Sequence, residues 1–252
     1  VVRDMVGRSI TEYYPGRTNE PGEIVLEVKN FCQEGLFNNI SFKLRKGEIL
    51  GVAGLMGAGR TEIMRALFGV DSCKHGEVYL HGKKVCIKKP EDAIKAGIGF
   101  ITENRKSEGL ILDFSISRNI ALPSVDTFAK RSVINAKNET AFSEALSKKL
   151  GVKTASIDLE AGALSGGNQQ KVVIAKWIGM NPSIIIMDEP TRGIDVGAKR
   201  DIYDLMNELT SQGVAIIMVS SELPEVIGMS DRILVIHEGK IAGELDHEEA
   251  TQ

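Results

Sequence analysis

The chain has 252 residues, of which 42% are hydrophobic and 26% are charged, and its 31 Lys and Arg against 34 Asp and Glu give a net charge of −3. This composition excludes a disordered chain, which would lack the apolar residues for a core. A net charge near zero also argues against a nucleic-acid-binding protein, which usually presents a basic surface.

Residues 1–22 are polar and contain Pro15, Gly16, Pro21 and Gly22, so they are predicted to be an inter-domain linker. The chain opens on Val-Val-Arg-Asp, without Met and without a charged and apolar leader. We therefore expect its start to be a cut made inside a longer protein.

Strand-like and helix-like segments alternate over the rest of the chain, which predicts one domain over residues 23–252. Strands are expected at 24–28, 40–44, 49–53, 77–80, 84–87, 98–102, 183–187, 214–219, 232–236 and 240–243. Helices are expected at 61–68, 90–96, 167–178, 198–211 and 223–228. The predicted fold class is α/β, with a mostly parallel central sheet covered on both faces and an N-terminal antiparallel β part.

Residues 104–163 are more polar and mostly helical in pattern, with residues 139–150 as the clearest helix. They separate two otherwise adjacent strands, which indicates an inserted helical subdomain. No apolar run in the chain approaches the roughly 18 residues that cross a bilayer, so membrane contact is expected only through a partner. The three cysteines have no metal-like spacing and are expected to be reduced thiols.

A glycine-rich loop, Gly54-Leu55-Met56-Gly57-Ala58-Gly59-Arg60-Thr61, follows the apolar strand 49–53 and opens a helix. It fits the phosphate-loop pattern G-x-x-x-x-G-K-[ST] except that Arg60 stands in place of Lys. Glycines let successive backbone N–H groups turn toward phosphate oxygens, and the helix N-terminus adds partial positive charge. Thr61 is the expected Mg²⁺ ligand from this loop; the alternative is an ordinary glycine turn between a strand and a helix.

Two acids, Asp188 and Glu189, follow a run of apolar residues at the predicted carboxyl end of a buried strand. Ligands bind at this edge of open α/β sheets. In a phosphate site the first acid holds Mg²⁺ and the second polarises an attacking water. We therefore expect Asp188 to be a metal ligand and Glu189 to be the catalytic residue.

A third motif, Leu164-Ser165-Gly166-Gly167-Asn168-Gln169, precedes a predicted helix. A hydroxyl and bare N–H groups at a helix start suit an anion, although the motif alone also fits an ordinary N-cap.

The three motifs in this order resemble the nucleotide-binding domain of ATP-binding-cassette (ABC) proteins, over residues 24–245. The resemblance implies a P-loop NTPase of ABC type that binds ATP with Mg²⁺ and hydrolyses it. It also implies that Leu164–Gln169 is the signature that completes the pocket of a partner domain, that Asp195 lies in the D-loop, and that Ser221 occupies the position of the switch histidine. A generic phosphate-loop kinase is excluded by the signature.

Three residues depart from the family pattern, and all fall on the domain's own nucleotide pocket. Arg60 keeps the charge of the usual Lys but has a larger, planar head. Glu103 stands where the family has Gln and is expected to ligate Mg²⁺. Ser221 donates a hydrogen bond but no positive charge. For the aromatic residue that stacks on adenine, Phe31 is the nearest candidate, but a core Phe is the preferred interpretation.

The finer resemblance is to the second cassette of tandem ATPases that drive sugar import, with ribose as the favoured sugar. Met5-Val6-Gly7-Arg8 resembles the segment that joins the two halves. The implied partners are the N-terminal ABC half of the same polypeptide, integral membrane permease subunits and, indirectly, a periplasmic sugar-binding protein. Peripheral attachment at the cytoplasmic face of the cell membrane is expected, with no nucleic-acid partner.

Two other functions stay open at this point. One is a catalytically weak regulatory module that binds nucleotide and contributes its signature to the partner. The other is an ABC protein acting on ribosomes or DNA, which the charge of −3 disfavours.

Overall fold

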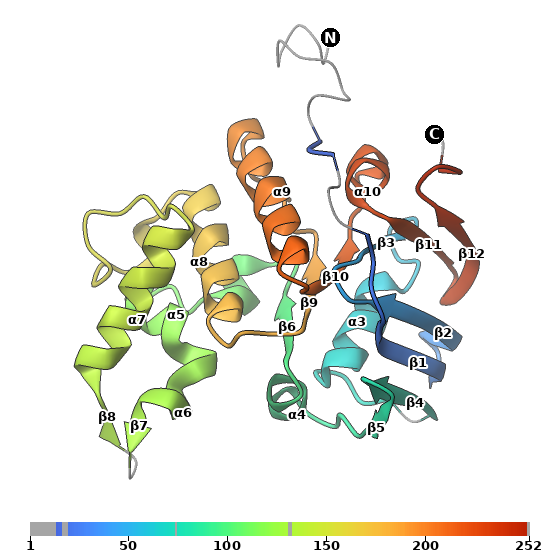
Figure 1. Ribbon diagram of the computed structural model, residues 1–252, viewed down its shortest axis with the longest axis horizontal. Coiled ribbons are helices and arrows are strands. Elements are labelled where there is room, and N and C mark those ends of the chain that lie inside the picture. Colours follow the sequence, from blue (N-terminus) through green and yellow to red (C-terminus); the bar gives the residue numbers. More distant parts are fainter. Residues whose placement is uncertain (1–13, 17–19, 74, 131–132, 251–252) are drawn as a thin grey trace, which may run out of the picture.

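The computed structural model describes residues 14–16, 20–73, 75–130 and 133–250 (Figure 1). Most of the predicted linker, including Met5–Arg8, lies outside the described residues. Within it, Tyr14 packs against Tyr203 with 5.3 Å between the ring centroids. The linker itself stays a prediction.

A six-stranded sheet forms the centre of the domain, in the order β12-β11-β3-β10-β9-β6. Its strands are β3 (Ile49–Ala53), β6 (Ile98–Ile101), β9 (Ile184–Asp188), β10 (Ala215–Val219), β11 (Arg232–His237) and β12 (Lys240–Asp246). Neighbouring strands are parallel except β11 and β12, which are antiparallel. Every residue of β9 and β10 is buried, so both faces are covered, as their continuous apolar runs predict.

A second sheet is antiparallel, in the order β2-β1-β4-β5. Its strands are β1 (Ile24–Gln33), β2 (Phe37–Arg45), β4 (His75–Leu80) and β5 (Lys83–Val85). Buried and exposed residues alternate along much of β2, which is the pattern of a strand with one face on the core. The predicted antiparallel β part is therefore confirmed, with β1 and β2 longer than predicted.

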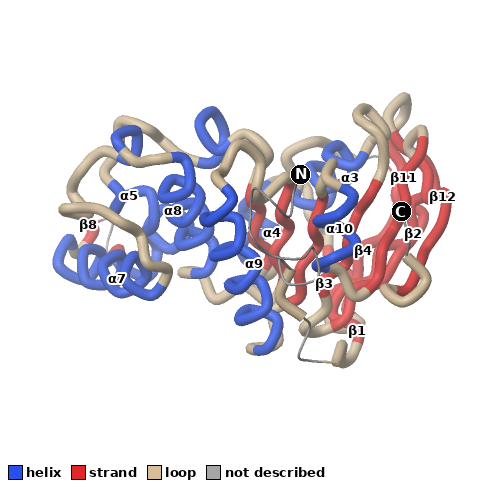
Figure 2. Tube along the Cα trace, turned by 90° about the horizontal axis from the view of Figure 1, so that it is seen from above, coloured by secondary structure: helices blue, strands red, loops and turns tan. Residues whose placement is uncertain are grey.

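The helices fall into two groups, and Figure 2 shows most of them gathered on the side away from the antiparallel strands. Those that pack on the central sheet are α3 (Arg60–Phe68), α4 (Pro90–Lys95), α8 (Gly166–Ile178), α9 (Val196–Ser211) and α10 (Leu223–Met229). The inserted region contains α5 (Ile116–Ala121), α6 (Val125–Phe128) and α7 (Ala136–Lys149), with short helical turns at η1 (Arg105–Gly109), η2 (Leu122–Ser124) and η3 (Ala161–Ala163).

The predicted mostly helical subdomain is thus present, with two local differences. A short hairpin of β7 (Ala129–Lys130) and β8 (Val133–Ile134) interrupts it. Helix α7 begins three residues before the predicted start, because the Asn135 side chain caps it by accepting a hydrogen bond from the Asn138 N–H at 3.2 Å.

The described helices include none with the length and apolar character that a bilayer span requires. All three cysteines are free thiols, as predicted.

Candidate nucleotide site

The glycine loop lies between the end of β3 and the start of α3. Gly54, Gly57 and Gly59 have positive φ angles of 157°, 78° and 99°, a region that L side chains rarely adopt. The Ala58 N–H donates to the Leu55 carbonyl at 3.0 Å, which closes the loop. Leu55 and Met56 are 77% and 91% exposed. Their side chains therefore point to solvent, and the inner side of the loop is formed by the backbone.

Asp188 is the last residue of β9, at the same sheet edge as the glycine loop, with β10 between the two strands. The residue is 1% exposed. Both of its carboxylate oxygens are buried and have no hydrogen-bond partner of good geometry among the described residues. Burial raises the pKa of Asp188 to about 6, and the nearby Thr61 hydroxyl offsets only part of that effect. Burying a carboxylate without a hydrogen-bond partner is energetically costly.

Glu189 follows with a positive φ of 50°, and its N–H donates to the Val219 carbonyl at 2.9 Å. Its side chain is 10% exposed. The Ser221 hydroxyl donates to Glu189 Oε2 at 3.1 Å, and Arg60 Nη2 lies 3.8 Å from Glu189 Oε1. Burial raises the pKa of Glu189, while Ser221 and Arg60 work in the opposite direction. The switch-position serine therefore contacts the expected catalytic carboxylate directly.

The Arg60 side chain passes along the glycine loop, with its Cδ 3.4 Å from the Cβ position of Gly54. Its Nη1 donates to the Ser220 carbonyl at 2.7 Å, and the residue is 8% exposed. The guanidinium is thus held between the segment after β10 and Glu189.

The signature residues begin helix α8. Ser165 is exposed, and its hydroxyl accepts a hydrogen bond from Asn168 Nδ2 at 3.0 Å. Asn168 Oδ1 in turn accepts from the Lys153 N–H at 2.9 Å. Leu164 precedes this turn half-buried, and Gln169 is buried and donates to the Ala161 carbonyl at 3.3 Å. The Ser165 hydroxyl is therefore fixed in place on an exposed surface.

Glu103 and Asp195 each contact a partner within this chain. Glu103 forms an ion pair with Arg192, and both side chains are largely exposed. Asp195 caps α9, with Oδ1 accepting from the Ala198 N–H at 2.9 Å. The structure gives Glu103 a cationic partner in this chain, and its Mg²⁺-ligand role stays a prediction.

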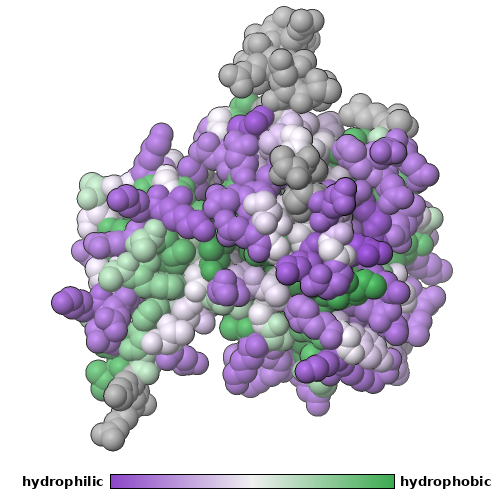
Figure 3. Space-filling model, in the orientation of Figure 1, coloured by the Kyte–Doolittle hydropathy of each residue, from purple (hydrophilic) through white to green (hydrophobic). Residues whose placement is uncertain are grey.

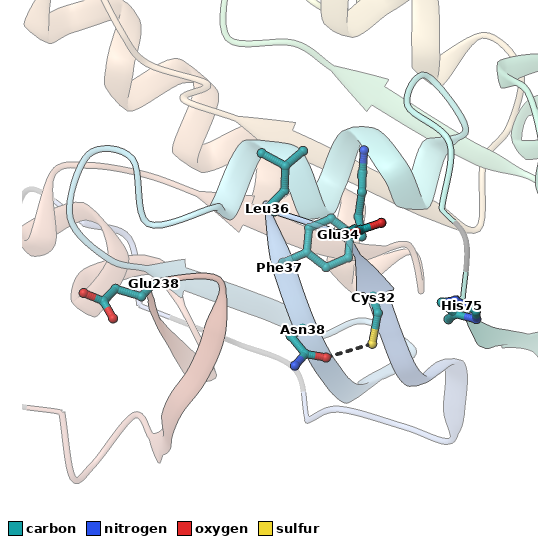
Figure 4. Close-up of a pocket in the computed structure, with 9 residues that line it drawn as sticks. Cys32, Glu34, Leu36, Phe37, Asn38, His75 and Glu238 are labelled. Atoms are coloured by element: carbon teal, nitrogen blue, oxygen red, sulfur yellow. Dashed lines mark hydrogen bonds between the residues drawn. The ribbon is translucent and has the colours of Figure 1, made fainter.

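A cavity of about 530 Å³ lies beside the glycine loop, lined by residues 32–38, His75 and Glu238. The Leu36 carbonyl lies 3.4 Å from the Cβ position of Gly59, and the Gly239 N–H donates to the Ala58 carbonyl at 2.9 Å. Figure 4 shows Glu238 and His75 on opposite sides of the segment that carries Leu36 and Phe37. The volume is that of a small-molecule pocket.

Phe31 does not offer a free ring face to this cavity. It is 5% exposed and stacks on Phe37, with 5.5 Å between the ring centroids. The preferred interpretation of Phe31 as a core residue is confirmed.

Two contacts at the site had no signal in the sequence. The buried Thr191 hydroxyl donates to the buried Glu225 carboxylate at 2.7 Å. Arg105 donates to the carbonyls of Arg192 and Gly193. Both contacts join residues more than 30 positions apart, so only the tertiary structure brings them together.

Comparison with known proteins gives consistent results. A family profile described as ABC transporter matches residues 37–192. The chain is 63% identical over all of its length to the ribose import ATP-binding protein of Oceanobacillus iheyensis and 62% identical to that of Bacillus subtilis strain 168. It spans about half the length of these curated relatives, 51% in each case.

Solved structures share the fold. An ATP-binding cassette of an ABC transporter in its ADP conformation superposes with a TM-score of 0.74, at 24% identity, over 90% of this chain and 93% of the other. A dimeric cassette bound to ADP and Pi gives 0.75, at 22% identity, over 88% of this chain and 98% of the other. The predicted ABC-type P-loop fold is confirmed.

Proposed function

The chain belongs to the ABC transporter family, and from that premise we propose that it is the ATP-binding and ATP-hydrolysing half of a tandem ATPase. Its role is to power the import of a monosaccharide, ribose, across the cytoplasmic membrane. The observation that carries the nucleotide role is the pair of buried, unpartnered Asp188 oxygens at the sheet edge where the glycine loop begins α3.

The residues present fit Mg²⁺. A carboxylate and a hydroxyl, from Asp188 and Thr61, are hard oxygen ligands, and Mg²⁺ bound with a nucleotide needs only one or two from the protein. Among the described residues there is no cluster of three or more His, Cys, Asp or Glu that would hold a metal alone. Mg²⁺ would neutralise charge on the β- and γ-phosphates when bound.

The proposal assigns a task to the glycine loop, the neighbouring cavity, Glu189 and Ser221. The backbone N–H groups of Gly54–Thr61 bind the phosphates, and the cavity beside the loop takes the base. Glu189 polarises the attacking water as general base, and burial raises its pKa above the ordinary value. Ser221 orients that carboxylate through its hydrogen bond.

The partner surfaces are proposed on the same basis. The exposed Ser165 and the N–H groups of Gly166 and Gly167 contact the γ-phosphate of ATP bound by the N-terminal half. Permease subunits cover part of the helical subdomain, over which Figure 3 shows apolar surface. The exposed apolar side chains of that subdomain are Ile111, Phe114, Leu122, Val133, Ile134 and Leu159. A periplasmic sugar-binding protein acts through those permeases, and the chain attaches to the cytoplasmic face of the membrane.

The names of the relatives support ribose as the transported sugar, since they are ribose import proteins at 56–63% identity. The sugar pocket itself lies in other chains.

A second candidate function, a catalytically weak regulatory module, has its own supporting observation. Arg60 donates to the Ser220 carbonyl and forms an ion pair with Glu189. The cation of the loop is therefore paired with the expected catalytic base and not directed at a phosphate. ATP would have to draw Arg60 away before both groups could act.

Glu189→Gln separates the two candidates. We expect ATP turnover to fall at least about a hundredfold, because a general base contributes that much or more. Nucleotide affinity, measured by the fluorescence of an N-methylanthraniloyl ATP analogue, should change little, because the loop and Mg²⁺ hold the phosphates. Low turnover in the unaltered protein that Glu189→Gln leaves unchanged would favour the regulatory module. Equal loss of binding and turnover would contradict the role of Glu189.

Arg60→Lys tests the departure in the glycine loop. A Lys side chain would release the Ser220 carbonyl and Glu189 and reach the phosphates, so ATP affinity at this pocket should rise by about tenfold. Isothermal titration with ATP and Mg²⁺ measures it, with Arg118→Lys in α5 as a control. Unchanged or weaker binding would show that the loop has adapted to the guanidinium.

A further inference from the structure

Arg105 joins two parts of the proposed site that are far apart in sequence. It begins the π-helical turn η1, which follows β6. Its Nη1 donates to the Arg192 carbonyl at 2.8 Å and its Nη2 donates to the Gly193 carbonyl at 3.3 Å. Both carbonyls belong to the loop between β9 and α9, which connects Glu189 to Asp195.

The same guanidinium lies against the start of the signature helix. A Cβ added to Gly166 would lie 2.7 Å from Arg105 Nη2 and 3.5 Å from the Gly193 carbonyl. Gly166 therefore leaves room for Arg105, and the guanidinium packs directly on the backbone of the signature. One side chain thus touches both the signature and the loop that precedes Asp195.

The turn that carries Arg105 is held from several directions. Glu103 pairs with Arg192, and Glu108 Oε2 lies 3.6 Å from Arg65 Nη1 on α3. The buried Lys176 on α8 donates to the Gly109 carbonyl at 2.8 Å. Arg105 is therefore presented from a fixed turn.

We propose that Arg105 is a positioning residue that holds Ser165–Gly167 in register with the 192–195 loop, so that the signature meets the phosphate bound by the partner half. This inference rests on the proposed function of the signature. The inference goes beyond that function because it assigns the relative position of the signature and the 192–195 loop to one side chain from a third segment.

The chemistry requires Arg at this position. The planar guanidinium offers donors in a fixed fork that reaches two carbonyls at once, whereas the single ammonium of Lys reaches them with no fixed direction. Arg105→Lys keeps the charge and removes the fork, so it tests geometry rather than electrostatics.

The experiment uses the tandem protein proposed above, with Arg105→Lys, Arg105→Ala, Ser165→Arg and, as a control, the exposed neighbour Lys106→Ala. Three quantities are measured: kcat for ATP, the affinity of the Gly54–Thr61 pocket for the fluorescent ATP analogue, and amide hydrogen exchange at residues 165–167 and 192–195. For both Arg105 variants we expect kcat to fall by about tenfold, with KM and affinity within about twofold of the unaltered protein. Exchange should become faster in both segments, and Lys106→Ala should change none of the three.

Two results would overturn the inference while leaving the proposed function intact. The first is near-normal kcat in both Arg105 variants while Ser165→Arg abolishes turnover. The second is loss of nucleotide affinity together with kcat, which would make Arg105 merely structural. Near-normal turnover in Ser165→Arg would instead refute the trans role of the signature, and the role of Arg105 with it.

Discussion

Ser165→Arg is expected to abolish ATP turnover at the pocket of the partner half, by at least about a hundredfold. Ser165 is exposed, and its hydroxyl is fixed by Asn168 at 3.0 Å, so it is ready to meet a phosphate carried by another domain. A bulky cation there would block closure of the two halves and displace the hydroxyl and N–H donors. Phosphoryl transfer depends almost entirely on such positioning and electrostatics, which is why the loss should be large.

The measurement is steady-state ATPase activity and transport in the tandem protein that carries only this change. Ala145→Arg, at an exposed position of α7, introduces the same cation elsewhere on the helical subdomain and should leave turnover near normal. The pocket at Gly54–Thr61 should still bind nucleotide in Ser165→Arg. If turnover at the pocket of the partner half persists, the signature has no role in trans.

Asp188→Asn should make the nucleotide-free chain more stable at neutral pH and remove its response to Mg²⁺. The pKa of Asp188 rises from 3.8 to about 6 on folding, chiefly through burial. Well below pH 4 the carboxyl is protonated in both the folded and the unfolded chain, so its titration does not lower the free energy of unfolding. Between about pH 4 and pH 6 the unfolded carboxyl loses its proton first, so stability falls as the pH rises. Above that window the cost is constant, about 3 kcal/mol.

Urea unfolding of the nucleotide-free chain from pH 4 to pH 7.5 tests this expectation. Asp188→Asn should raise the free energy of unfolding at pH 7.5 by about 3 kcal/mol, with the difference closing as the pH falls toward 4. The exposed Asp113→Asn serves as the control. In the same variant Mg²⁺ should no longer tighten binding of the ATP analogue. A less stable variant, or one that keeps its Mg²⁺ response, would contradict the assignment of Asp188 as the metal ligand.

Much of the fold follows from local sequence. The apolar runs at Ile184–Met187 and 214–219 specify buried parallel strands because they are apolar on both faces. The glycine loop is equally local, since glycine adopts the positive φ angles found at Gly57 and Gly59 without the steric cost that a side chain brings. The order of the strands in the central sheet is not local, because it depends on crossovers between distant segments.

The contacts of the site are less predictable, because they too join segments that are distant in the sequence. Sequence identified Arg60 and Glu189 as site residues, but their proximity depends on β3, β9 and β10 lying side by side. The ion pair of Glu103 with Arg192 crosses from one loop to another. Nothing in the pattern around Arg105 marks it, because the two carbonyls to which it donates lie almost 90 residues away in the sequence.

The measurement that tests the central claim most directly is ATP hydrolysis by the tandem protein assembled with its permease in proteoliposomes, in the presence of the sugar-binding protein. The account predicts Mg²⁺-dependent hydrolysis that rises when the binding protein carries ribose and is accompanied by ribose uptake, both lost in Ser165→Arg. Hydrolysis that is indifferent to every monosaccharide and accompanied by no uptake would contradict it.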